Sequence, residues 1–119
     1  MGEEFKEINM TIIMIKPLST NKQWAGRRFK TKEYEAYEWE LSSKLPKMDI
    51  PKNVPLRLIL SFGFSSKASD LSNAVKATED IICKKYRYDD KWHFEIYLYK
   101  EIVKKGEEFI QFDIEIIKI

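Results

Sequence analysis

Cysteine and histidine are nearly absent from this sequence, which has one of each, Cys83 and His93, in 119 residues. A single cysteine excludes a disulfide within the chain. Its place in an expected helix, between Ile82 and Lys84, indicates a small core residue rather than a catalytic thiol. We therefore expect a reducing compartment, the cytoplasm. The lone His93 sits in an alternating strand pattern and is expected to be a surface or half-buried strand residue.

Long hydrophobic runs are also missing, so no segment is expected to span a membrane. The first residues, MGEEFKEINM, are acidic and lack the basic-then-apolar order of a signal peptide. Hydrophobic residues make up 44% and aromatic residues 13% of the chain, which is enough for a packed core and argues against disorder. The length predicts a single domain over residues 1–119.

Acidic residues are missing from residues 8–32, where six basic residues occur, and Asp49 is the only acid in residues 44–69. The formal net charge of +2 therefore hides a basic first half joined to a half that supplies carboxylates. A basic surface beside acids suits an enzyme that acts on a polyanion with a metal between them. A chance charge distribution is the alternative.

Hydrophobic periodicity predicts an α+β domain, β-α-β-α-β-β, with two helices packed on a four-stranded mixed sheet. Thr31 is an expected N-cap, and the aromatic residues Tyr34, Tyr37 and Trp39 of the helix that follows are expected in the core or at a dimer interface. The segment 104–107 is expected to be a hairpin loop between the last two strands. The expected strands are residues 10–15, 54–64, 92–99 and 110–116, the expected helices are 32–45 and 70–85, and residues 16–30 are expected to form a long loop.

One stretch, SDLSNAVKATEDIICKKYRYDD, collects carboxylates around a lysine. Each feature has an ordinary explanation: Asp70 can cap a helix, Lys76 and Asp80 can form an i,i+4 pair, and Asp89 and Asp90 can lie in a turn. The other reading is a divalent-metal site that cuts a phosphodiester.

The order of these residues resembles the RusA family of Holliday junction resolvases. That family's pattern is D-x-D-N-x-x-K, a helix, a turn and then D-D before a strand; here the chain reads D-L-S-N-x-x-K, with an aspartate four residues later and D-D after the helix. Ser19-Thr20-Asn21-Lys22, after a first strand that ends in a proline, also resembles the family's S/T-N loop. The resemblance covers nearly the whole chain.

The resemblance implies a homodimeric endodeoxyribonuclease that depends on Mg²⁺, with Mn²⁺ able to substitute, and nicks four-way or branched DNA symmetrically in recombination and repair. It places the metal on Asp70 and Asp90 and the essential lysine on Lys76. Further residues are expected to support this site: Ser72, Asn73, Asp80 and Asp89. Phosphate contacts are expected from Lys22, Arg27, Arg28 and Lys30. Trp24 would stack on unpaired bases or anchor its loop.

The sequence departs from the family pattern at Ser72, where the family has a second aspartate, and the turn glycine before Asp89 is absent. A serine hydroxyl brings no negative charge to a metal site. One alternative is therefore a catalytically weakened protein that binds branched DNA without cutting it. Another is an unrelated α+β interaction module whose acids serve only as caps and turns.

Overall fold

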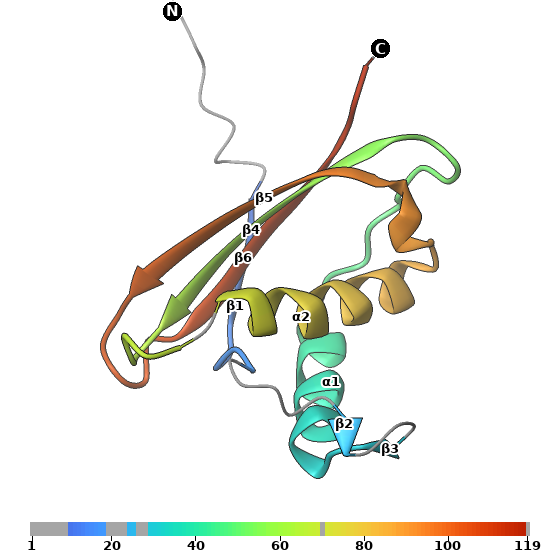
Figure 1. The fold of residues 1–119 in the computed structure, drawn as a ribbon. Helices are drawn as coiled ribbons and strands as arrows, with labels where there is room; N and C mark the ends of the chain where they lie inside the picture. Colours follow the sequence, from blue (N-terminus) through green and yellow to red (C-terminus); the bar gives the residue numbers. More distant parts are fainter. Residues whose placement is uncertain (1–9, 19–23, 26–28, 70, 119) are drawn as a thin grey trace, which may run out of the picture.

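The computed structural model describes residues 10–18, 24–25, 29–69 and 71–118. Two helices, α1 (Lys32–Lys44) and α2 (Leu71–Tyr86), lie on one side of a four-stranded mixed sheet (Figure 1). The strands of this sheet are β1 (Thr11–Met14), β4 (Leu56–Phe64), β5 (His93–Ile102) and β6 (Phe109–Ile116). The expected α+β fold, with its β-α-β-α-β-β order, is confirmed. Within the expected loop, β2 (Trp24–Ala25) and β3 (Phe29–Lys30) form a short antiparallel pair.

The sheet order is β1-β6-β4-β5, so the two last strands of the chain are not neighbours. β6 pairs antiparallel with both β1 and β4, whereas β5 pairs parallel with β4. The prediction of a hairpin at residues 104–107 is therefore wrong, because β4 lies between the strands that this loop joins. Alternation specifies which face a residue occupies but not which strand lies beside it. α2 provides the long crossover that two parallel strands require.

The core lies between the helices and the sheet, and alternate residues of β4 are its centre. Leu58, Leu60 and Phe62 are completely buried there. α1 begins where expected, because the Oγ1 atom of Thr31 accepts the backbone N–H of Tyr34 at 3.0 Å. The two helices are joined in the core by a 2.7 Å hydrogen bond between the hydroxyls of Tyr37 and Thr78.

Neither of the helices in the described part of the chain lies over the opposite face of the sheet (Figure 1). Large hydrophobic side chains are exposed there on the two edge strands: Ile12 and Met14 on β1, and Tyr97 and Tyr99 on β5. At one end of this face, Arg57, the second residue of β4, donates to Glu95 on β5 at 2.6 Å and to Glu115 on β6 at 2.8 Å. This face is thus apolar along both edge strands. The ion pairs of Arg57 with Glu95 and Glu115, which we call the Arg57 row, run across it.

Three other expectations about side chains can be compared with the structure. Cys83 is buried, as expected for a small core residue. Tyr34 and Tyr37 are buried, but Trp39 is 74% exposed, which excludes the core for Trp39 and leaves the dimer interface as the remaining prediction. Helical periodicity puts Trp39 on the face of α1 opposite the buried stripe of Tyr34, Tyr37 and Leu41. Across the described ranges, no helix combines the length and the apolar character needed to cross a membrane.

Candidate functional site

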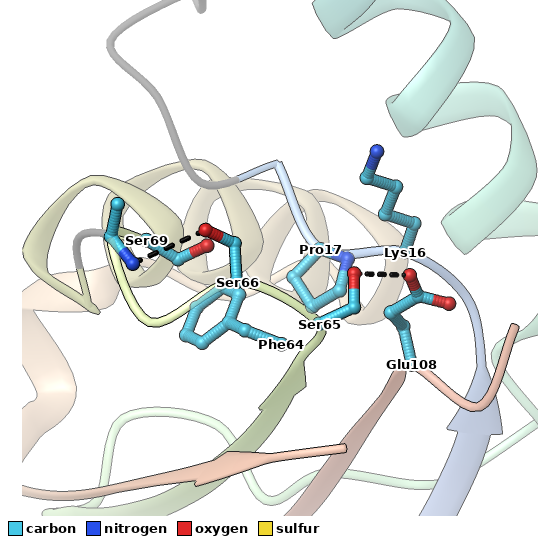
Figure 2. A pocket seen from close by; sticks show the side chains of 8 residues that line it. Lys16, Pro17, Phe64, Ser65, Ser66, Ser69 and Glu108 are labelled. Atoms are coloured by element: carbon cyan, nitrogen blue, oxygen red, sulfur yellow. Dashed lines mark hydrogen bonds between the residues drawn. The ribbon is translucent and has the colours of Figure 1, made fainter. Parts of the chain in front are cut away.

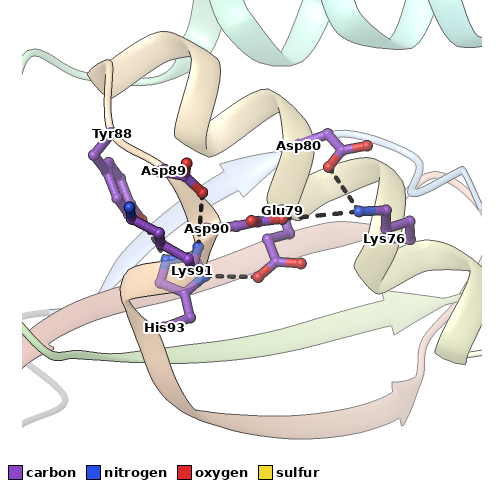
Figure 3. A network of polar contacts seen from close by, with 8 residues as sticks. All are labelled: Lys76, Glu79, Asp80, Tyr88, Asp89, Asp90, Lys91 and His93. Carbon is purple, nitrogen blue, oxygen red and sulfur yellow. Dashed lines mark hydrogen bonds and ion pairs between the residues drawn. The ribbon is translucent and has the colours of Figure 1, made fainter.

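Two carboxylates from different elements meet at the ammonium group of Lys76 on α2 (Figure 3). The Nζ atom lies 3.2 Å from Oδ1 of Asp80, one turn further along the helix, and 3.8 Å from Oδ2 of Asp90. The contact with Asp80 follows from the helical repeat, which places residues four apart on one face. The contact with Asp90 is a tertiary one. All three side chains are accessible, with exposures of 61% for Lys76, 31% for Asp80 and 45% for Asp90.

The turn after α2 brings Asp90 back against the helix. Arg87 follows the last helical residue with a φ of 60°, in the left-handed region that usually favours glycine. Asp90 then begins the short 3-10 helix η2 (Asp90–Trp92), whose N-cap is Asp89. The carboxylate of Asp89 accepts the backbone N–H of Lys91 at 2.9 Å. The adjacent acids thus do different things: Asp89 caps the turn, and Asp90 faces Lys76.

The surrounding carboxylates raise the pKa of Lys76. The main cause is the hydrogen bond to Asp80; desolvation opposes it, and the negative charges of Asp80, Asp90 and Glu79 add to the upward shift. Lys76 is therefore a cation at every pH at which phosphodiester chemistry is usually assayed. It is suited to stabilise negative charge and not to act as a general base.

A second polar group lies directly beneath this cluster and was not predicted from the sequence. His93, at the start of β5, has a side chain only 1% exposed. Its Nδ1 lies 2.6 Å from Oε2 of Glu79, and its Nε2 lies 2.6 Å from the hydroxyl of Tyr88 (Figure 3). His93 is half-buried as a whole residue and lies in a strand, as expected, but its ring is buried and paired at both nitrogens, which was not expected. A possible signal was the place of Glu79 three residues after Lys76, on the same side of the helix.

Several of the predicted residues lie outside the described ranges: Asp70, Lys22, Arg27 and Arg28. Ser72 and Asn73 lie in the first turn of α2, four and three residues before Lys76, and therefore on its side of the helix. Trp24 lies in β2, paired with Lys30 of β3. The ammonium of Lys30 lies 3.2 Å from Glu38 of α1 and over the Tyr34 ring, so it contacts α1 in this conformation.

The described side chains around Lys76 offer part of what a magnesium ion needs. Asp80 and Asp90 offer only carboxylate oxygens, accessible to solvent, which is the chemistry that Mg²⁺ prefers. The ammonium between them marks a position where positive charge is favoured. Among the described residues, no three acidic, histidine or cysteine side chains converge as a metal site. The described part of the site therefore fits one or two protein ligands of Mg²⁺, and the predicted further ligand, Asp70, immediately precedes α2.

A cavity of about 240 Å³ lies where β1 and β4 end and the chain turns toward α2 (Figure 2). Its lining shares no residue with the Lys76 cluster. The Ser65 hydroxyl donates to Glu108 at 2.7 Å, and this bond lowers the pKa of the Glu108 carboxyl. The lining residues are Lys16, Pro17, Phe64, Ser65, Ser66, Ala68, Ser69 and Glu108.

Comparison with known proteins adds no relative. No family model matches this sequence, and no curated protein matches it significantly.

Proposed function

We propose that this protein is a magnesium-dependent endonuclease that cuts branched DNA, with the four-way Holliday junction as its substrate. The observation that carries the proposal is the meeting of Asp80 and Asp90 at the ammonium of Lys76 on an accessible surface. The choice of a DNA junction rests on the resemblance of the D-L-S-N-x-x-K…D-D order to the RusA family.

In this proposal each side chain has a distinct task. Asp90, together with Asp70, holds the metal ion, which activates water and neutralises phosphate charge when bound. Lys76 stabilises the negative charge that builds up on the scissile phosphate. Asp80 keeps the lysine in place through its 3.2 Å contact. Ser72 and Asn73 offer hydrogen-bonding groups one turn before Lys76.

We further propose a homodimer, because paired nicks in a two-fold symmetric junction need two sites. The uncovered face of the sheet supports this. Exposed apolar side chains that are rimmed by polar groups are typical of protein interfaces, and Met14 and Tyr99 are each 55% exposed on this face. The Arg57 row neutralises two of the acids there, which lowers the repulsion between two copies.

A cytoplasmic location is part of the proposal. Burial raises the pKa of the Cys83 thiol to about 12. The thiol therefore stays protonated at neutral pH and is a poor nucleophile. This property is consistent with a structural cysteine in a reducing compartment.

The test is a cleavage assay on a synthetic mobile four-way junction, with a linear duplex of the same sequence as control, in Mg²⁺, in Mn²⁺ and in EDTA. The parent, Asp90→Asn and Asp70→Asn are compared with Asp49→Asn, which removes an exposed acid far along the chain from the site. The expected result is metal-dependent paired nicks in the junction alone, lost in the two site variants and kept in Asp49→Asn.

Other outcomes would replace the proposal with a named alternative. Tight junction binding without any nicking would favour the branched-DNA-binding protein, in which a serine at position 72 leaves the metal site too weakly charged. No preference for the junction over the duplex at low salt would leave an α+β interaction module.

A further inference from the structure

The segment that carries Asp90 is closed at one end by the partly buried Tyr88 and at the other by the buried ring of His93. Tyr88 precedes the two aspartates and His93 follows η2, and the two side chains bond to each other at 2.6 Å with their rings edge to face at 5.2 Å. His93 also bonds to Glu79 of α2 at 2.6 Å. The result is a loop of six residues, closed by Tyr88 and His93 and anchored on α2 by Glu79 (Figure 3). We call these three residues the clamp.

The hydrogen bonds of the clamp are complete in either protonation state of His93. With a neutral ring, Nδ1–H donates to Glu79 and Nε2 accepts from Tyr88. With a charged ring, Nδ1–H still donates to Glu79, and Nε2–H donates to the Tyr88 oxygen. Burial is the main reason that the pKa of Tyr88 is raised, so its hydroxyl keeps its proton.

The clamp, and not the ion pair at the surface, holds Asp90 in place. The contact between Asp90 and Lys76 is long, at 3.8 Å, and both side chains are largely exposed. Exposed ion pairs of this kind restrain the backbone very little. The Glu79–His93 bond is short, and its two side chains are 12% and 1% exposed, so water cannot easily replace either partner. Asp89 shapes the turn through its cap but makes no described bond to α2.

The anchor also lies on the element that carries the rest of the site. Glu79 is three residues from Lys76 and adjacent to Asp80 in the helix. The anchor thus fixes the position of Asp90 relative to the helix that bears Lys76.

We propose that Glu79, His93 and Tyr88 are positioning residues that fix the carboxylate of Asp90 beside α2, where a metal ion can reach it, and so determine the metal affinity of the site. The role of the three residues in metal binding rests on the proposed function. Their role in holding the turn against α2 does not. Loss of a group that orients a metal ligand typically costs about 10–100-fold in metal affinity or activity.

The test uses Tyr88→Phe, which removes one hydroxyl, and Glu79→Ala, which removes the anchor. Glu79→Gln keeps an oxygen that accepts from Nδ1 and serves as the conservative rescue. The control is Glu40→Gln, which breaks an exposed i,i+4 pair with Lys44 on α1. Each protein is first checked for cooperative unfolding in urea. Two measurements follow, neither of which needs catalysis.

The first measurement is hydrogen exchange at the amides of Tyr88 and Trp92, which donate to the carbonyls of Cys83 on α2 and of Asp89 in the turn. We expect exchange to accelerate about tenfold in Tyr88→Phe and Glu79→Ala, because a buried hydrogen bond is lost. The second is Mn²⁺ affinity in the absence of DNA, from the electron spin resonance signal of free Mn²⁺. We expect it to weaken at least about tenfold in the same two variants and to be largely restored in Glu79→Gln.

Folded variants with unchanged exchange at both amides would refute the clamp. Faster exchange with unchanged Mn²⁺ affinity would refute its role in positioning the metal site. A parent protein that binds no Mn²⁺ overturns the proposed metal-dependent function and, with it, the positioning role. In that case the exchange data still decide whether the clamp holds the turn.

Discussion

Replacement of Lys76 by methionine should separate the proposed metal binding from the proposed catalysis at the candidate site. The ammonium lies 3.8 Å from the Asp90 carboxylate, and both side chains are well exposed, at 61% and 45%. In a water-like dielectric, two unit charges at this distance attract each other by about 1 kcal/mol. A divalent cation must compete with that attraction for the same carboxylate. Lys76→Met should therefore bind Mn²⁺ about fivefold more tightly than the parent.

Cleavage should change in the opposite direction. A positively charged group aimed at the developing charge of a transition state commonly contributes about 10²–10³ in rate. Single-turnover cleavage of the four-way junction at saturating Mn²⁺ should therefore fall by a factor of that order in Lys76→Met. The matched control is Lys84→Met on the same helix, whose ammonium contacts Glu38 and not the acids of the site.

Either of two results would refute this reasoning. Weaker Mn²⁺ binding in Lys76→Met would mean that the lysine supports the metal site and does not compete with the metal. An unchanged cleavage rate at saturating metal would mean that the ammonium does not act on the phosphate. The comparison with Lys84→Met removes the general effect of one lost positive charge.

The pH dependence of the pair follows from the direction of its pKa shift. The pKa of Lys76 is raised above its ordinary 10.5, first by the hydrogen bond to Asp80. Any stability from this pair is thus complete below pH 10.5 and is lost as the pH rises through the raised value. Asp80→Asn should lower the pKa of Lys76, which a titration of its Cε resonance by NMR would follow. An unchanged pKa would show that Asp80 does not hold the lysine in solution.

Three further predictions concern the frame of the site. Arg87→Gly should stabilise the protein by about 0.5–1 kcal/mol in urea unfolding, because glycine adopts the φ of 60° without strain; a loss of stability would contradict the turn geometry. Gly63→Ala should cost about 1–3 kcal/mol in the same assay, because a Cβ there would overlap the ring of Phe109; a neutral result would mean that the ring moves freely. Tyr99→Glu should dissociate the proposed homodimer, measured by sedimentation velocity, because it places a charge on the uncovered apolar face; an intact dimer would place the interface elsewhere.

Local sequence signals identified the elements well because each depends on neighbours in the chain. Thr31 caps α1 as its side chain predicts, and the helical repeat places Asp80 beside Lys76. Alternation along residues 54–64 identified the buried strand at the centre of the core. The hairpin between the last two strands failed for the opposite reason. Which strands lie side by side depends on how the whole sheet buries its apolar face. The alternation within one strand does not specify the strand beside it.

The sequence by itself thus determined the order of the elements, their apolar faces and the candidate residues along α2 and the D-D turn. Only the tertiary structure decided that β4 lies between β5 and β6, that Asp89 caps while Asp90 faces Lys76, and that His93 is buried on Glu79 and Tyr88. The physical reason is the separation along the chain between the residues that interact. Caps and i,i+4 pairs form within one turn of chain, whereas the bonds of His93 join residues 14 and 5 positions away and form only once the turn has packed on the helix.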